Sequence, residues 1–204
     1  MLEAADLHSR RGARTLFRNL SFALAQGELV RVAGENGSGK TTLLKILAGL
    51  LDPDAGEVRW QGESIGRLRE EYSRHLVFLG HAPAVKDELT AAENLSVACR
   101  LAGRPVPEEA VEEALTRYGL PRGPIPVRRL SQGQRRRAAL ARLILSPDAP
   151  LWLLDEPFAA LDVAAARLTE ELIARHVAAG GAVAYTTHQE ANIDAAVRRV
   201  LELG

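Results

Sequence analysis

A run of small and charged residues, GENGSGKTT at positions 34–42, has the composition of a phosphate-binding loop. Its spacing matches the pattern G-x-x-x-x-G-K-[ST] at Gly34, Gly39, Lys40 and Thr41. Glycines let backbone N–H groups converge on phosphate oxygens, the lysine reaches the β- and γ-phosphates, and the threonine hydroxyl binds Mg²⁺. The residues predicted to contact the nucleotide are Gly34, Glu35, Asn36, Gly37, Ser38, Gly39, Lys40, Thr41 and Thr42. The loop alone is shared by kinases, GTPases and ATPases.

Two adjacent carboxylates, Asp155 and Glu156, follow the apolar run at residues 151–154. A continuous apolar run is typical of a strand buried on both faces of a parallel sheet. At the tip of such a strand, Asp155 can hold Mg²⁺ together with Thr41. Its neighbour Glu156 is placed to orient or deprotonate an attacking water. The pair predicts hydrolysis of a phosphoanhydride, with Asp155 and Thr41 as metal ligands and Glu156 as a catalytic residue.

The elements that position these residues follow an α/β pattern with a helical interruption. Hydrophobic periodicity predicts strands at residues 28–33, 57–61, 75–79, 151–154 and 182–186, and helices at 41–50 and 163–179. From about residue 83 to 146 the pattern is helical, with helices predicted at 90–101, 107–118 and 131–145. The phosphate loop therefore lies between a strand and a helix, which is the context that its motif requires.

Size and charge narrow the class of protein further. The 204 residues suit one domain, and 26 basic against 26 acidic residues leave no overall positive field to attract nucleic acid. The single cysteine, Cys99, excludes an internal disulfide, and we expect a buried structural thiol. No apolar run reaches the length of about 18 residues that a membrane-spanning helix needs, and residues 1–12 lack the apolar core of a signal peptide. We therefore expect a cytosolic protein unless a partner holds it at a membrane.

Further segments carry a family resemblance. LSQGQ at residues 130–134 opens a basic helix, AALD stands at 159–162, and His188 follows a predicted strand in YTTHQ. Together with the phosphate loop and LWLLDEP at 151–157, these segments resemble the nucleotide-binding domains of ABC transporters over nearly the whole chain. The resemblance implies a single domain over residues 1–204: a RecA-like core sheet with an antiparallel β subdomain at 1–82 and 147–204, and a helical signature subdomain at 83–146.

The resemblance also implies roles for individual residues. Ser131, Gly133 and Gln134 belong to the signature that contacts the γ-phosphate bound by the partner subunit of a head-to-tail homodimer. Ser131 is in addition a suitable N-cap for the helix that follows. His188 matches the switch histidine that contacts the γ-phosphate and steadies the water, and Asp162 matches the loop that links the two sites. ATP and Mg²⁺ are the implied ligands.

Two positions depart from the usual family pattern. His81 stands where many members have a glutamine whose amide meets Mg²⁺ and water, and a neutral imidazole can replace it in part through one donor and one acceptor. The place of the aromatic that stacks on adenine falls near Arg10 or Arg11, whose planar guanidinium can also stack on a base. We interpret the basic run at 135–137 as a solvated helix face near the nucleotide, in preference to a nucleic-acid contact.

The particular residues of these motifs resemble those of the ATP-binding export proteins of cytochrome c biogenesis, also called haem exporter ATPases. That resemblance rests on LGHAP at 79–83, LTAAENL at 89–95 and TTHQ at 186–189. It implies CcmB- and CcmC-like membrane subunits, peripheral attachment to the cytoplasmic side of the bacterial inner membrane, and a role in haem delivery. The alternatives are the ATPase of another small ABC exporter and a soluble ABC ATPase that serves iron–sulfur assembly or DNA repair. A nucleotide switch without hydrolysis is disfavoured by Glu156 and His188.

Overall fold

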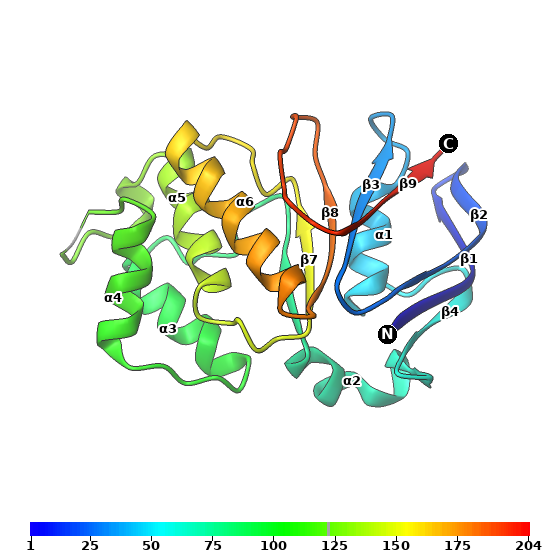
Figure 1. Ribbon diagram of the computed structural model, residues 1–204, viewed down its shortest axis with the longest axis horizontal. Coiled ribbons are helices and arrows are strands. Elements are labelled where there is room, and N and C mark those ends of the chain that lie inside the picture. Colours follow the sequence, from blue (N-terminus) through cyan, green and yellow to red (C-terminus); the bar gives the residue numbers. More distant parts are fainter. Residues whose placement is uncertain (122) are drawn as a thin grey trace.

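The computed structural model describes residues 1–121 and 123–204. Its first sheet is antiparallel, with strand order β2-β1-β4-β5 (Figure 1). The strands are β1 (Leu2–Arg11), β2 (Arg14–Leu24), β4 (Ala55–Trp60) and β5 (Glu63–Ser64). The turn between β1 and β2 contains Gly12 at a φ of 62°, a conformation that glycine adopts without strain. This sheet supplies the hairpin that lies beside the phosphate loop.

The second sheet has five strands and is parallel throughout. In spatial order they are β6 (Leu76–Leu79), β7 (Leu151–Asp155), β8 (Ala182–Thr186), β3 (Glu28–Gly34) and β9 (Val197–Leu203). Every residue of β7 and β8 is buried, in keeping with their mostly apolar sequences, and each strand ends in a buried polar residue, Asp155 or Thr186. Because the strands are parallel, the ends of β3, β7 and β8 meet at one edge of the sheet, where α/β proteins bind their ligands.

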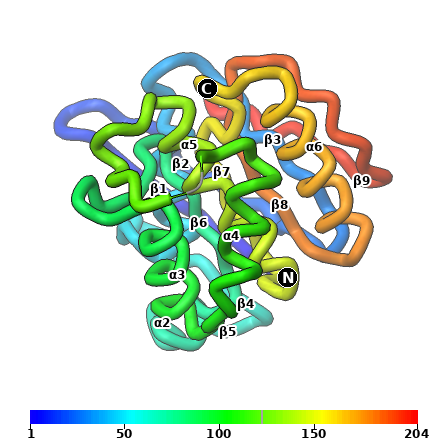
Figure 2. Tube along the Cα trace, turned by 90° about the vertical axis from the view of Figure 1, so that its left-hand side faces the viewer, coloured from blue at the N-terminus to red at the C-terminus, as the bar shows by residue number. Residues whose placement is uncertain are grey.

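Helices cover this sheet and form a separate group beside it. Next to the sheets lie α1 (Lys40–Leu47), α2 (Ile65–Arg74) and α6 (Val163–Ala178). The helical group contains α3 (Ala91–Leu101), α4 (Glu108–Arg117), α5 (Gln132–Leu140) and the 3₁₀ turns η1 (Val127–Arg129) and η2 (Ala141–Leu143). Figure 1 shows this group at one end of the molecule, opposite the antiparallel sheet, and Figure 2 views the molecule from the helical end.

Two hydrophobic clusters lie on opposite faces of the parallel sheet. Side chains alternate along β7, so that Trp152 and Leu154 join one cluster while Leu151 and Leu153 join the other. The first cluster contains residues of α6 and of the helical group, including the buried Cys99. The second joins α1 to the antiparallel sheet. The central strands are thus fixed from both sides, and the loops at their ends start from rigid positions.

The predicted fold class, an α/β domain with an antiparallel β subdomain and a helical insertion, is confirmed, and several boundaries differ. The helix α1 ends at Leu47 because the chain turns at Gly49, whose φ is 69°. The helix expected at 131–145 changes after Leu140 into the 3₁₀ turn η2. The helix α2 was not predicted: its sequence is mostly polar and buries only Tyr72, although Ile65, Leu68 and Tyr72 recur at helical spacing and pack on the second cluster. The subdomain division at 83 and 146 remains a prediction.

Within the described residues, the longest helices fall short of what a bilayer crossing requires in length and apolar character.

Candidate active site

The phosphate loop links the end of β3 to the start of α1. Gly39 precedes α1 in a left-handed conformation with a φ of 106°, and a Cβ at this position would lie 3.0 Å from the Cβ of Leu16. Only glycine fits both the backbone and the space. Lys40 is buried, and its Nζ donates to the carbonyl oxygens of Gly34 at 2.7 Å and Glu35 at 2.9 Å. The loop therefore surrounds a fixed positive charge at a helix N-terminus, an arrangement suited to phosphate.

The buried carboxylate of Asp155 lies at the end of β7. Only 1% of the residue is exposed. Its Oδ1 accepts a hydrogen bond of 2.7 Å from the hydroxyl of Thr186, at the end of the neighbouring strand β8. Its Oδ2 has no hydrogen-bond partner among the described residues. A buried carboxylate oxygen without a partner in the described part of the chain, on a residue that lines the same pocket as Thr41, is a suitable ligand for Mg²⁺, which prefers oxygen donors.

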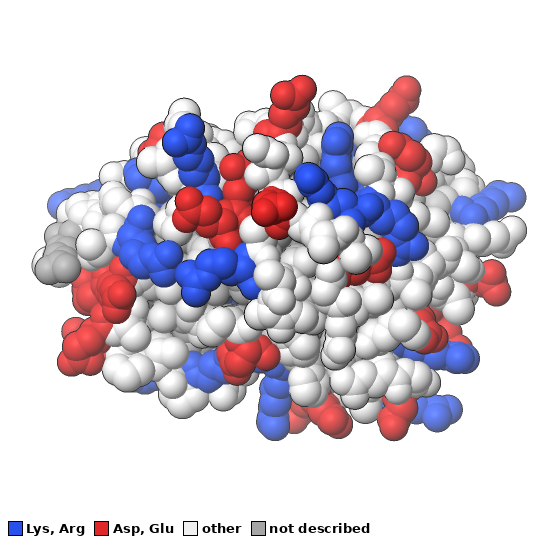
Figure 3. Space-filling model, in the orientation of Figure 1, with Lys and Arg blue, Asp and Glu red and all other residues white. Residues whose placement is uncertain are grey.

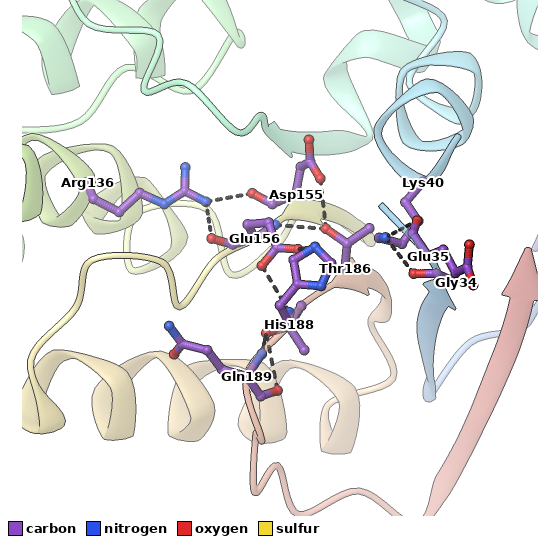
Figure 4. Close-up of polar contacts among 10 residues, drawn as sticks. Gly34, Glu35, Lys40, Arg136, Asp155, Glu156, Thr186, His188 and Gln189 are labelled. Carbon is purple, nitrogen blue, oxygen red and sulfur yellow. Dashed lines mark hydrogen bonds and ion pairs between the residues drawn. The ribbon is translucent and has the colours of Figure 1, made fainter. Parts of the chain in front are cut away.

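Glu156 occupies a sharp turn directly after β7. Its φ of 53° is in the left-handed region, which side chains other than glycine rarely adopt. The turn is held in part by its N–H, which donates to the hydroxyl of Thr186 at 2.9 Å. The carboxylate accepts a hydrogen bond of 3.2 Å from the backbone N–H of His188, and its Oε1 lies 3.4 Å from Nε2 of the same histidine (Figure 4). A carboxylate and an imidazole thus face one another at the edge of the sheet.

One pocket joins these groups. Its lining brings together the phosphate loop, the carboxylates Asp155 and Glu156 and the histidines His81 and His188. The phosphate loop contributes Asn36, Gly37, Gly39, Lys40, Thr41 and Thr42, and the remaining lining residues are Arg11 and Leu16. Gly34 and Glu35 contribute their carbonyls to Lys40, while Ser38 is buried within the loop and does not line the pocket. The sequence thus identified most of the pocket, including His81 from the segment after β6.

Of the two arginines predicted near the base, only Arg11 lines the pocket. Arg10 instead pairs with Asp54, through its backbone N–H at 2.7 Å and its guanidinium at 3.3 Å. Leu16 is a lining residue that the sequence analysis did not identify, since an isolated leucine in a strand carries no functional signal. Arg11 and Leu16 both come from the β1–β2 hairpin.

The predicted signature residues lie elsewhere. Ser131 caps α5: its hydroxyl accepts from the N–H of Gln134 at 3.2 Å, and its own N–H donates to the side chain of Gln134 at 2.8 Å. Asp162 caps α6 and pairs with Arg137 at 3.5 Å. Gly133 packs so closely on the loop before α6 that a Cβ would lie 2.7 Å from the carbonyl oxygen of Ala160.

The pocket that contains Lys40 includes none of Ser131, Gly133, Gln134 and Asp162 in its lining. Figure 1 shows α5 and α1 on opposite sides of β7 and β8. The phosphate loop and the signature are therefore separate within one chain.

The interpretation of residues 135–137 as a solvated helix face was wrong. Arg136 is 3% exposed, and its guanidinium donates to backbone carbonyls. Arg135 and Arg137 are partly buried, and both donate to backbone carbonyls as well. Three consecutive arginines point in different directions around a helix, so a single environment could not hold for all of them.

Comparisons with known proteins agree with this geometry. The family profile described as "ABC transporter" matches residues 17–159. The cytochrome c biogenesis ATP-binding export protein CcmA of Aromatoleum aromaticum is 54% identical over 192 residues, which cover 94% of this chain and 90% of the relative. The protein of the same name from Dechloromonas aromatica is 48% identical over 205 residues, covering both chains completely.

Solved structures show the same fold. A putative ABC transporter ATP-binding protein from Pyrococcus furiosus superposes with a TM-score of 0.81 at 26% identity, covering 99% of this chain and 96% of that one. An ATP-binding cassette, described as dimeric and bound to ADP and Pi after hydrolysis, gives a TM-score of 0.81 at 25% identity, covering 93% and 88% of the two chains.

Proposed function

The chain belongs to the ABC transporter family and is similar over its length to its CcmA members, and on that premise we propose that two copies hydrolyse ATP at shared sites to drive a step of cytochrome c maturation. The observation that carries the proposal is the pocket in which the phosphate loop meets a glutamate–histidine pair and a buried carboxylate with one oxygen that has no partner among the described residues. These are the parts that phosphoanhydride hydrolysis requires.

Each group has a definite task in this proposal. Lys40 and the amides at the start of α1 bind the β- and γ-phosphates. Thr41 and Asp155 would hold Mg²⁺, which when bound neutralises negative charge on the phosphate oxygens. Glu156 orients and deprotonates the attacking water, while His188 and His81 steady the γ-phosphate and that water.

The separation of the phosphate loop from the signature supports a head-to-tail dimer. An open pocket with Lys40 on one chain needs further donors around the γ-phosphate, and Ser131, Gly133 and Gln134 at the start of α5 offer an exposed helix N-terminus for this purpose. The related cassette described as dimeric supports the same assembly. We propose that the partner's signature closes each pocket.

The names of the relatives and one feature of the surface support a proposal of membrane partners. An apolar cleft lies between the segment after β6 and the helices α3 and α5, with Phe78, Ala82, Val85 and Ala98 in its lining. The adjacent residue His81 faces the nucleotide pocket. One short segment thus borders both the nucleotide and the cleft, and we propose that CcmB- and CcmC-like subunits at the cytoplasmic side of the bacterial inner membrane act through it during haem delivery.

The charge distribution of the chain does not indicate a nucleic-acid partner. The net charge is zero, and acidic and basic side chains are interspersed on the face shown in Figure 3.

The proposed roles are tested by two substitutions in the purified protein. Lys40→Ala is expected to lose ATP binding, because the charge at the centre of the loop is removed. Glu156→Gln is expected to bind ATP and to accumulate as a closed dimer, because binding is preserved while water activation is lost. Equilibrium binding and size-exclusion chromatography with ATP measure both effects. Normal turnover in Glu156→Gln would refute the catalytic role of this carboxylate.

Co-purification separates the proposed partner from the alternatives. Capture of a CcmB-like membrane subunit from the native membrane supports the role in cytochrome c maturation. Capture of a different exporter's membrane subunit, or of none, favours another small ABC exporter or a soluble ABC ATPase.

A further inference from the structure

Arg136 is a buried arginine of α5 whose guanidinium connects two loops of the nucleotide pocket. Its Nη1 donates to the carbonyl oxygens of Gly80 at 2.7 Å and His81 at 3.3 Å. Its Nη2 donates to the carbonyl oxygens of Asp155 at 2.7 Å and Glu156 at 2.6 Å (Figure 4). All four acceptors are backbone carbonyls, so the side chain fixes the path of the chain at both loops.

These two loops carry the groups that face the γ-phosphate in the proposed function. The first loop follows β6 and places His81 in the pocket, and the second follows β7 and places Glu156 there. Arg136 itself belongs to α5, whose N-cap is the signature residue Ser131. Arg136 therefore links the helix that would contact the partner's nucleotide to the two loops that would act on the nucleotide bound by its own chain.

The turn at Glu156 needs such support. With a φ of 53°, Glu156 has a backbone conformation that persists only where its surroundings enforce it. Thr186 binds the N–H of this residue, and Arg136 binds its carbonyl, so the peptide groups on both sides of the Cα are held. Burial lowers the pKa of Arg136, and the negative charges of Asp155 and Glu156 act in the opposite direction.

The neighbouring arginine provides a contrast. Arg135 donates to the carbonyls of Leu130 and Arg128 and pairs with Asp87 at 3.1 Å, all outside the pocket lining and all in or next to the helical group. It thus stabilises the helical part without touching the catalytic loops. The two adjacent arginines thus differ in whether they contact the catalytic loops, and Arg135 is also the more exposed of the two.

We propose that Arg136 is a positioning residue, which sets the Glu156 carboxylate and the His81 segment according to the position of α5. This inference rests on the proposed role of Glu156 in hydrolysis. When the dimer closes and α5 moves, the guanidinium of Arg136 would then shift the catalytic loops of the same chain. The two pockets of the dimer would be coupled in this way.

The test compares Arg136→Lys with the matched control Arg135→Lys. Lysine keeps the positive charge, but its compact ammonium cannot span two loops as the planar guanidinium does. For Arg136→Lys we expect kcat to fall by about tenfold or more while KM and ATP affinity change by less than about threefold. For Arg135→Lys, kcat is expected to stay within about twofold of the unmodified chain.

A second measurement separates positioning from a general loss of structure. In a Glu156→Gln background, adding Arg136→Lys should lower the single-turnover rate by a clearly smaller factor than in the unmodified chain, because the part of the effect that passes through Glu156 is already lost and only the part through the His81 segment remains. An undiminished kcat in Arg136→Lys overturns the positioning role alone. The same role is overturned if adding Arg136→Lys lowers the single-turnover rate of Glu156→Gln by the full factor seen in the unmodified chain. Loss of ATP binding together with turnover makes Arg136 a determinant of the fold and also overturns the proposal. Normal turnover in Glu156→Gln overturns the proposed function itself.

Discussion

The hydroxyl of Thr186 joins the carboxylate of Asp155 to the backbone N–H of Glu156. The residue is fully buried at the end of β8. Its Oγ1 donates to Oδ1 of Asp155 at 2.7 Å and accepts from the N–H of Glu156 at 2.9 Å. Thr186→Val keeps the volume of the side chain and removes both bonds. We predict that removal of this hydroxyl lowers both the free energy of unfolding and the rate of ATP hydrolysis.

The magnitude follows from what remains unpaired. A hydrogen bond to a charged group contributes about 1.5–3 kcal/mol, and a buried amide left without an acceptor costs about 1–3 kcal/mol. Because both bonds share one hydroxyl, the two losses are not fully additive, and we expect the free energy of unfolding to fall by about 3 kcal/mol. The rate should fall by at least about tenfold, which corresponds to only about 1.4 kcal/mol of lost positioning of Asp155 and Glu156.

Urea unfolding and steady-state ATPase rates measure the two effects. Thr187→Val is the matched control, because Thr187 is also buried while its hydroxyl bonds locally with the backbone of Gln189. We expect the control to lose no more than about 2 kcal/mol and to keep its kcat, because its two hydrogen bonds join uncharged groups and contribute about 1 kcal/mol each. Equal stability and equal kcat in Thr186→Val and the unmodified chain would refute the network described around Asp155.

Two further predictions concern pH and base recognition. His176 stacks on Trp152 with ring centroids 3.8 Å apart, and burial lowers its pKa to about 4. Between pH 6.5 and 4, the unfolded chain therefore takes up a proton on His176 that the folded chain does not. The free energy of unfolding is expected to fall by up to about 3 kcal/mol over this range. In a His176→Phe variant, the free energy of unfolding should fall by less over the same range. Arg11→Ala should weaken ATP binding roughly fivefold if its guanidinium stacks on the base. Arg10→Ala, in which only the guanidinium contact with Asp54 is lost, should bind ATP normally. Equal affinities in the two variants would exclude Arg11 as the base contact.

The parts of the site that lie in continuous motifs could be predicted from the sequence. Residues 34–42 specify their own loop, since the glycines, the lysine and the helix that follows act locally. Asp155 and Glu156 were identified for the same reason, because an apolar strand and its polar tip are adjacent in the chain. The assignment of catalytic roles to Glu156, His188 and His81 remains a prediction that the substitutions above test.

The missed residues depend on contacts between distant segments. Thr186 lies 31 residues after Asp155, and the two meet because β7 pairs with β8 in the register Asp155↔Thr186. No local pattern specifies that pairing. Arg136 was misjudged because RRR at 135–137 gives no indication of which side chain faces the strand ends. That choice depends on how α5 packs against the loops after β6 and β7.

The central claim is that each pocket is completed by the other copy, and complementation tests it directly. Lys40→Ala and Ser131→Arg should each be inactive alone. In their mixed dimer, the intact phosphate loop of one chain meets the intact signature of the other, so one pocket of two is complete. Random pairing of equal amounts then restores up to about one quarter of the unmodified activity, the value for pockets that act independently, and coupling between the pockets lowers it. An inactive mixture, or full activity in a strictly monomeric preparation of the unmodified chain, would contradict the shared site.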